Sequence, residues 1–249
     1  MVEKVVDAIK NVTLNNCIFA GWCGVGCDVV ASEEVTLRGC EFSDGERTSE
    51  SMAMRLRAGS ESIHIEQCHF EKSGVEAALL IGGATEREQF IPQITDDAKP
   101  GEHFEARAVR VIGCTFIDQP CPMIFAHADR VTVRSNTIVR PERYVMAALQ
   151  ASEEPALASN RHLTFGQNLV TWKAGRLSGL LLLDQANKDV SLAFEENLWW
   201  SDDPVAVRSR MIPGIARQQF PQVLDIDPNL DDALRPQIAS AQQFGRGME

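Results

Sequence analysis

The feature that most constrains the fold is an eight-residue pattern that recurs along most of the chain. Two apolar residues separated by one position are followed by two residues, then by cysteine or asparagine, one further residue and a third apolar residue. The copies begin at Val12, Val35, Ile63, Val109, Val131, Leu163 and Leu192, and the last has a competing alignment that starts at Val190. Self-similarity at intervals of about 20–50 residues is typical of repeat proteins, whose units bury their apolar faces against one another.

Each copy predicts a β-strand. Its apolar residues alternate with a period of two, and the shortest interval between copies, 22 residues, is too short for a pair of helices. Further apolar segments that follow the copies predict second strands at Met52–Leu56, Ala77–Ile81, Met123–Phe125, Val145–Leu149 and Leu180–Leu183. Two or three short strands per repeat predict an all-β, single-stranded right-handed parallel β-helix of about seven or eight coils over residues 11–200.

The position occupied by cysteine or asparagine predicts a column of stacked side chains in the interior. Asparagine there can hydrogen-bond its copies above and below and satisfy buried backbone groups. Cysteine fits as a small, mostly apolar side chain, and a redox or metal-binding device is the alternative. The column consists of Cys17, Cys40, Cys68, Cys114, Asn136 and Asn168. The chain has seven cysteines, an odd number, which excludes a fully disulfide-bonded monomer.

The segments outside the repeats are expected to complete one domain over residues 1–249. Val2, Val5, Val6 and Ile9 lie on one face of a short helix, which predicts an amphipathic cap over residues 2–10. A long insertion is predicted at residues 84–103. Residues 201–249 contain several prolines and no repeat, and are expected to be irregular chain packed on the solenoid.

The net charge of the chain limits the classes of partner that it is expected to bind. Lys and Arg total 24 against 35 Asp and Glu, a formal net charge of −11. Such a surface repels phosphate backbones and anionic lipid, so neither nucleic acid nor a membrane is expected as a partner. The start MVEKVVDAIK lacks the apolar stretch of a signal peptide, which indicates a cytoplasmic protein unless a leader has been removed. The oligomeric state is left open.

The repeats resemble those of right-handed β-helix proteins of the pectate-lyase-like superfamily. Likeness to a group of bacterial members is carried by residues 81–85 with 105–107, 136–141 with 145–150, 196–200 with 202–204, and a closing Asp227-Pro228. The resemblance implies a polysaccharide lyase or glycoside hydrolase that acts on an extended, uronate-containing glycan, and an extracellular or periplasmic location. An epimerase is a variant of this hypothesis. The alternative is a non-catalytic glycan-binding or structural module.

Candidate site residues lie along the second strands and at the end of the insertion. We expect a groove there that binds an acidic sugar through Arg55, Arg57, Arg107 and Gln150. Proton transfer is assigned to His127, Asp184 and Glu105. The alternatives are cross-strand ion pairs for the arginines and Asp184, a surface position for His127, and an anchoring role for Glu105.

No metal or cofactor is expected at this groove. The acidic pairs Asp96-Asp97, Asp202-Asp203 and Asp225/Asp227 offer carboxylate oxygens of the kind that bind calcium. Asp-Pro turns and helix caps explain these pairs equally well, so calcium is the less favoured interpretation.

Overall fold

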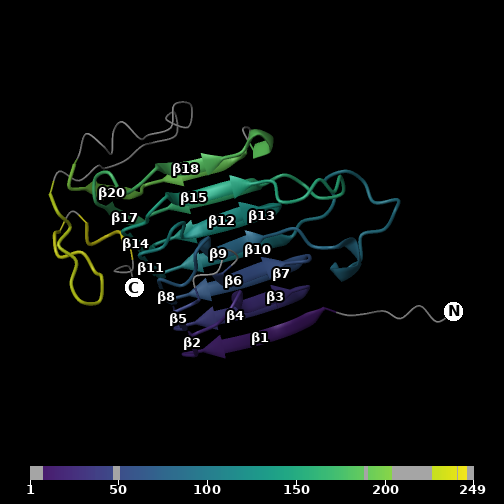
Figure 1. Ribbon diagram of the computed structural model, residues 1–249, viewed down its shortest axis with the longest axis horizontal. Helices are drawn as coiled ribbons and strands as arrows, with labels where there is room; N and C mark the ends of the chain where they lie inside the picture. The colour runs from purple at the N-terminus through teal and green to yellow at the C-terminus, as the bar shows by residue number, and fades with distance from the viewer. Residues whose placement is uncertain (1–7, 47–50, 188–189, 204–225, 240, 246–249) are drawn as a thin grey trace.

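The computed structural model describes residues 8–46, 51–187, 190–203, 226–239 and 241–245. These residues form an all-β structure whose strands lie in three parallel sheets (Figure 1). The helical segments among them are two short 3₁₀ turns, η1 (Arg87–Gln89) and η2 (Gln185–Asn187). Within the described ranges, no helix has the length and hydropathy needed to cross a membrane.

Each sheet takes every third strand along the chain. Sheet A contains β1 (Ile9–Asn15), β4 (Ser32–Arg38), β7 (Ser60–Glu66), β10 (Ala106–Ile112), β13 (Ala128–Arg134), β16 (Arg161–Gly166) and β19 (Leu192–Glu195). Sheet B contains β2 (Ile18–Ala20), β5 (Glu41–Ser43), β8 (His69–Glu71), β11 (Thr115–Ile117), β14 (Thr137–Val139), β17 (Leu169–Trp172) and β20 (Leu198–Ser201). Sheet C contains β3 (Val25–Val30), β6 (Met52–Arg57), β9 (Ala77–Gly82), β12 (Met123–Ala126), β15 (Tyr144–Leu149) and β18 (Gly179–Leu183).

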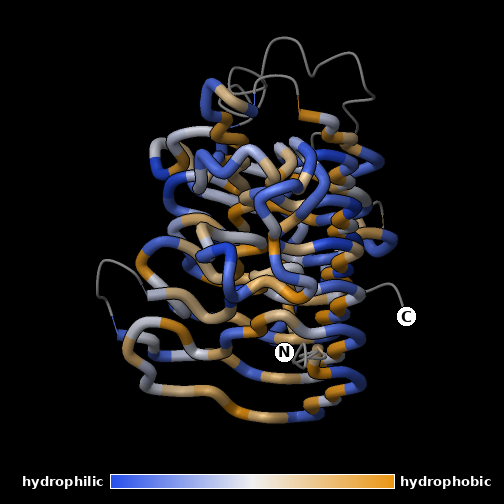
Figure 2. Tube along the Cα trace, turned by 90° about the vertical axis from the view of Figure 1, so that its right-hand side faces the viewer, coloured by the Kyte–Doolittle hydropathy of each residue, from blue (hydrophilic) through white to orange (hydrophobic). Residues whose placement is uncertain are grey.

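This topology is consistent with a parallel β-helix, in which three consecutive strands, one from each sheet, form one coil. Figure 2 shows the coils stacked one above another. The first two apolar residues of each copy lie on a sheet A strand, and the third lies on the sheet B strand that follows. The second apolar segments lie on sheet C strands, so both sets of predicted strands are confirmed. Leu163 pairs with Leu192, so the last copy follows the repeat and not the alignment at Val190.

The interior column of cysteine and asparagine lies between sheets A and B. Asn136 Oδ1 accepts from the backbone N–H of Cys114 at 2.8 Å, and Asn136 Nδ2 donates to Val111 O at 3.0 Å. Asn136 also donates to Asn168 Oδ1 at 2.9 Å, which joins successive coils. The column residues from Cys40 to Asn168 are buried, as predicted, and the cysteines are free thiols. Cys17 is the exception: it is only half-buried, because its coil is the first of the described stack.

Every sheet A strand from β1 to β16 contains one residue in the left-handed backbone region. These residues are Asn11, Glu34, Ser62, Ala108, Arg130 and His162, with φ between 53° and 59°. The strand pairing skips each of them: Lys10 pairs with Glu33, and the next pair is Val12 with Val35. The side chain of the left-handed residue therefore lies on the outer face of the sheet, and so do most of the side chains that directly precede it. The outer face of sheet A consequently carries extra polar columns.

The chain ends differ in part from expectation. The predicted cap helix is not seen in the described part of its segment, because Ile9 and Lys10 already pair with β4 as strand residues. Residues 2–7 lie outside the described residues. At the other end, Ala241 and Phe244 pack on Leu169 and Leu198 of sheet B. Residues 204–225 of that segment lie outside the described ranges.

The insertion between β9 and β10 projects from the end of sheet C that leads into sheet A (Figure 1). It has an apolar cluster of its own, in which Phe90 and Ile94 pack against Ala156 and Leu157. A β-bridge joins His103 to Leu157, and Arg87 forms a 3.0 Å ion pair with Glu154. The insertion and the segment that follows β15 therefore support each other.

Candidate functional site

Two of the predicted sugar-binding arginines share one acidic partner. Arg55 Nη2 lies 2.7 Å and Arg57 Nη2 3.1 Å from Asp28 Oδ2, on the outer face of sheet C. Burial raises the pKa of Asp28, but the hydrogen bonds and charges of the two arginines outweigh it and leave the pKa below its usual range. Arg57 also donates to Gln89 Oε1 of the insertion at 2.6 Å. Both arginines therefore make the cross-strand ion pairs that were the alternative to sugar binding.

Glu105 is fully buried where the insertion returns to the solenoid. Its carboxylate accepts from the backbone N–H of Ala58 at 2.8 Å and from that of Thr85 at 2.7 Å. The hydroxyl of Thr85 adds a third hydrogen bond at 2.7 Å. These contacts tie both ends of the insertion to β6, as expected of a loop anchor.

His127 is buried, not on the outer face where its place after a second strand had put it. Its φ of 57° turns the chain at the corner between sheets C and A. Nδ1 lies 2.8 Å from Ala158 O, and Nε2 accepts a hydrogen bond from the backbone N–H of Ser152 at 3.1 Å. The ring therefore joins the corner to the segment that follows β15.

Asp184 and Gln150 lie next to each other, because the backbone N–H of Gln150 donates to Asp184 Oδ2. Asp184 Oδ1 accepts from Asn187 through its backbone N–H and its side-chain amide, at 2.9 and 2.8 Å. Burial raises the pKa of Asp184, but these hydrogen bonds outweigh it and the pKa lies below its ordinary value. The catalytic roles assigned to Glu105, His127 and Asp184 stay predictions, and all three side chains hold backbone segments together.

A cleft of about 290 Å³ lies beneath the insertion, where a concavity was expected. Its floor belongs to sheet A and not to the second strands. Glu33, Glu61 and Arg107 contribute polar groups from that floor, and Pro92, His103 and Phe104 line it from the insertion. Arg107 forms an ion pair with Glu61. Of the predicted site residues, Arg107 lines this cleft, whereas Arg55 and Arg57 lie on the neighbouring sheet.

Next to the cleft, three neighbouring strands of sheet A carry a concentration of positive charge. We call it the arginine face, and it consists of Arg107 and Arg110 on β10, Arg130 and Arg134 on β13, and Arg161 on β16. The three strands contain a single carboxylate, Asp129. Flanking strands supply Glu61 for Arg107 and Glu195 for Arg134. The three strands thus carry five guanidinium groups and one carboxylate, in a chain whose net charge is −11.

Arg110 stands at the centre of this face. It is exposed and pairs in register with His64 on one side and Thr132 on the other. Among the residues that the structure describes, no carboxylate forms an ion pair with it. Its guanidinium is therefore available to an anion from outside the chain.

Asp129 is the carboxylate on which several cations of the face converge. His162 Nδ1 lies 2.7 Å and Arg161 Nε 3.4 Å from Asp129 Oδ1, and Arg130 Nε lies 3.2 Å from Oδ2. Burial raises the pKa of Asp129, but the hydrogen bond from His162 and the nearby positive charges outweigh it, so the pKa is lowered. Asp129 is thus held as a carboxylate within the arginine face.

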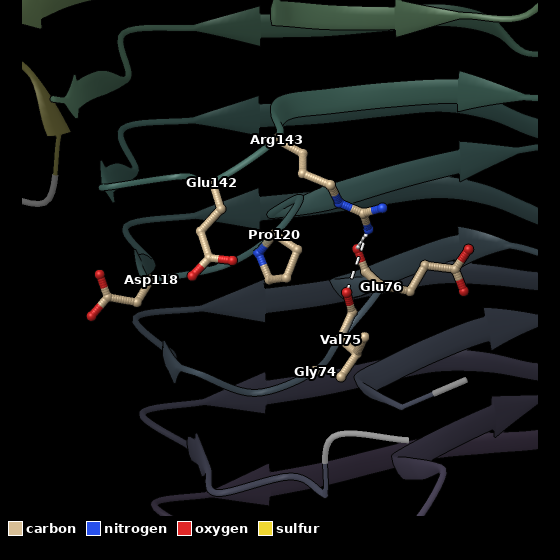
Figure 3. Close-up of a pocket in the computed structure, with 7 residues that line it drawn as sticks. All are labelled: Gly74, Val75, Glu76, Asp118, Pro120, Glu142 and Arg143. Carbon is tan, nitrogen blue, oxygen red and sulfur yellow. Dashed lines mark hydrogen bonds between the residues drawn. The ribbon is translucent and has the colours of Figure 1, made fainter. Parts of the chain in front are cut away.

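A larger hollow of about 440 Å³ lies at the corner between sheets B and C (Figure 3). Arg143 donates there to the backbone carbonyls of Val75 and Glu76, each at 3.4 Å. The side chains of Glu76, Asp118 and Glu142 also line it, and Asp118 is held by Arg140 at 2.6 Å. Three carboxylates against one lining arginine make this hollow unsuitable for an acidic sugar.

Sequence reasoning missed Arg110, Asp129, Arg130, Arg161 and His162 as site residues. The contact between His162 and Asp129 joins residues 33 positions apart, so neither residue indicates the other in the sequence. Alignment of the repeat copies contains the missing signal. With Val131 aligned to Leu163, Asp129 falls beside Arg161, as in the observed pairing, and Arg130 falls beside His162.

Comparison with known proteins adds no family or relative: no protein-family model matches the sequence, and no curated protein matches it. Within the described ranges, no group of three or more His, Cys, Asp or Glu side chains is arranged to hold a metal ion. Asp96 contacts Arg87 at 3.0 Å, Asp97 contacts Thr95 at 2.6 Å, and Asp225 lies outside the described residues. Calcium binding stays the less favoured alternative.

Proposed function

We propose that this protein is a carbohydrate-active, right-handed parallel β-helix of the pectate-lyase-like superfamily that binds an extended, uronate-containing glycan on its arginine face. The fold part of the proposal rests on the three parallel sheets and on the cysteine/asparagine repeat. The functional part rests on one observation: Arg110 is exposed and has no acidic partner among the described residues, within a cluster of arginines on an acidic protein.

The spacing of polar groups on the arginine face suits a linear polymer. Arg110, Thr132 and Thr164 follow one another in register across β10, β13 and β16. Neighbouring parallel strands lie about 4.8 Å apart, so these groups recur at short, regular intervals along the solenoid. Guanidinium groups bind sugar carboxylates through paired hydrogen bonds, and threonine hydroxyls both donate to and accept from sugar hydroxyls.

The adjoining cleft supplies contacts of a different kind. Phe104 and Pro92 offer apolar surface, while Glu33, Glu61 and His103 offer polar groups at the same place. Small-molecule sites commonly combine an apolar wall with a few polar groups that fix orientation. A sugar unit at the end of the bound stretch would occupy this cleft, with Arg107 shared between cleft and face.

Binding of polyuronates tests the proposal. Polygalacturonate, alginate and hyaluronan are titrated into the protein by calorimetry, with dextran as the neutral polymer. We expect binding to at least one polyuronate, weakening as salt rises because screening reduces the attraction between exposed charges. Arg110→Ala should weaken that binding about tenfold, equivalent to about 1.4 kcal/mol.

Arg38→Ala is the matched control, since Arg38 is an exposed sheet A arginine that is paired with Glu66 outside the arginine face. It should leave the affinity unchanged. Absence of binding to all three polyuronates would overturn the proposal. Equal losses from Arg38→Ala and Arg110→Ala would also overturn it, because affinity would then follow total charge and not this face.

A further inference from the structure

The outer face of sheet A is divided into two halves of opposite charge. Below the arginine face in Figure 1, strands β4 and β7 carry four glutamates and a single arginine, Arg38. The glutamates are Glu33, Glu34, Glu61 and Glu66. The strands above them, β10, β13 and β16, carry the five arginines and one aspartate of the arginine face. One regular surface therefore presents an acidic lower half and a basic upper half.

Each half contains one exposed charge that the chain itself does not neutralise. Glu34 is exposed on β4, and no cation in the described part of the chain forms an ion pair with it. Arg110 on β10 is its basic counterpart. The other glutamates of the lower half have partners: Glu33 with Lys10 at 2.7 Å, Glu66 with Arg38 at 2.7 Å, and Glu61 with Arg107. The two unpaired charges are therefore opposite in sign and lie on different strands.

These two strands are related through β7, which lies between them. Both β4 and β10 pair with β7, and His64 of β7 lies in register with Thr36 on one side and Arg110 on the other. Neighbouring strands lie about 4.8 Å apart, so Glu34 and Arg110 are each one strand away from β7. A two-fold axis that runs along β7, between two facing copies of the sheet, exchanges the positions of β4 and β10. It brings Glu34 of each copy opposite Arg110 of the other.

The strand on this axis faces its own copy. Its two glutamates, Glu61 and Glu66, are each neutralised by an arginine of the same chain, so their approach across the axis is not strongly repulsive. Seven strands at about 4.8 Å spacing and about 3.3 Å per residue give sheet A an outer face of roughly 600 Å². This area is somewhat below the roughly 800 Å² per partner of a typical specific interface. The face is therefore large enough for a weak dimer, whose affinity depends on charge.

We propose that two copies of this chain associate through the outer faces of sheet A, with their solenoids antiparallel and the acidic half of each against the basic half of the other. Such a contact is isologous, so every attractive pair occurs twice and assembly stops at the dimer. The inference goes beyond the proposed function and does not depend on it. Because the dimer covers Arg110, a second copy and a polyuronate exclude each other.

Exchange of the two unpaired charges tests the dimer. Molecular mass is measured by sedimentation equilibrium over a range of protein and salt concentrations. We expect a species of twice the mass of the 249-residue chain at low salt, which dissociates as salt rises because screening weakens exposed charge pairs. Glu34→Arg and Arg110→Glu should each weaken association at least about tenfold, since each places like charges opposite one another at two symmetric contacts.

Restoration of the dimer makes the test specific. A mixture of the two variants should associate again, because each contact then joins one acidic and one basic side chain. The double variant Glu34→Arg/Arg110→Glu should dimerise for the same reason, and its association also shows that both changes are compatible with folding. Arginine suits the backbone at position 34, since Arg130 occupies the equivalent left-handed position of β13 with φ of 54°.

Arg176→Glu and Glu142→Arg are the matched controls. Both positions are exposed and lie between a sheet B strand and the sheet C strand that follows it. The two substitutions change the net charge by the same amounts as the test variants, and they should leave association at the wild-type level. Equal losses in the controls would overturn the proposal, because association would then follow net charge and not this face.

The results separate this inference from the proposed function. A wild-type chain that stays monomeric at low salt overturns the dimer and leaves glycan binding in place. Failure of both the mixture and the double variant to associate overturns the antiparallel arrangement. Polygalacturonate added to a confirmed dimer should release monomers. A dimer that persists with the polymer bound overturns the arginine face as the glycan site and leaves the dimer in place.

Discussion

The interior column changes its chemistry between the lower and the upper coils, although the backbone around it does not change. In the lower coils the thiols of Cys40, Cys68 and Cys114 approach the carbonyls of Leu14, Leu37 and Ile65 at 3.4–3.7 Å. In the upper coils the amides of Asn136 and Asn168 donate to the carbonyls of Val111 and Val133 at 3.0 Å. These carbonyls occupy equivalent positions in successive sheet A strands. One structural position thus accepts two kinds of donor.

The two halves differ in what else holds their coils together. Asparagine also supplies an acceptor, so that Asn136, Asn168 and Asn197 form a continuous chain of hydrogen bonds between coils. A thiol is a much weaker acceptor than an amide oxygen. The lower coils instead stack Phe19, Phe42, Phe70 and Phe116 with ring centroids 4.5–4.9 Å apart. The difference teaches that apolar stacking and amide bonding are interchangeable ways to stabilise one coil on the next.

Thiol accessibility gives the largest expected effect. Cys23 is exposed, whereas Cys40, Cys68, Cys114 and Cys121 are buried. Burial also raises the pKa of Cys121 to about 12, so little of the reactive thiolate is present near neutral pH. We expect Cys23 to react with a thiol reagent at least about 10³-fold faster than the buried group, whose reaction requires local unfolding. Labelling followed by mass spectrometry measures the rates, and rapid modification of all seven thiols would contradict a closed lower half.

Removal of one amide from the upper half comes next in size. Asn168→Leu deletes the acceptor used by Asn136 and the donor that reaches Val133 O at 3.0 Å. We expect the free energy of unfolding to fall by about 3 kcal/mol, because each buried polar group left unpaired costs roughly 1–3 kcal/mol. Denaturant titration measures the change. A loss below about 1 kcal/mol would show that the amide chain does not hold the upper coils together.

The corresponding change in the lower half should cost less. Cys68→Ala removes a weak thiol donor, 3.7 Å from Leu37 O, and a small apolar volume. We expect a loss of about 1 kcal/mol, set mainly by the cavity that remains between the stacked coils. The same titration applies, with Asn168→Leu as the reference. Equal losses in the two variants would remove the distinction between the halves.

The sequence predicted the strands because a strand period and a marked interior position recur together. The apolar alternation located sheet A, and the second apolar runs located five of the six sheet C strands to within one residue at each end, but not β3. The cap helix was wrong in its described part, since Ile9 and Lys10, at the end of the helical pattern, pair with β4 as strand residues. Tertiary pairing overrode the local pattern there.

The arginine face was not predicted from the sequence, and the cause is the left-handed position in the sheet A strands from β1 to β16. No residue type marks it, since Asn, Glu, Ser, Ala, Arg and His all occur there. A simple alternation therefore assigns the side chains before Val131 and Leu163 to the wrong faces. The same kind of backbone conformation at His127 turned a predicted surface residue inward.

The left-handed position occurs in sheet A strands of both the cysteine half and the asparagine half of the column. A substitution there therefore tests the backbone conformation independently of the interior side chains. Ala108 adopts φ of 55° on β10, where the cysteine part of the column gives way to asparagine. An alanine is strained in this region and glycine is not. Ala108→Gly should therefore raise the free energy of unfolding by about 0.5–1 kcal/mol, despite the greater flexibility of glycine in the unfolded chain.

Ala193→Gly is the matched control, because Ala193 pairs with Thr164 as an ordinary strand residue. This variant should lower the free energy of unfolding by about 0.5–1 kcal/mol. Opposite signs in the two variants would establish that the kink is a property of the backbone in every sheet A strand that has it, independent of whether thiols or amides fill the interior. Destabilisation by both would place the kink's stability in the contacts of the Ala108 side chain instead.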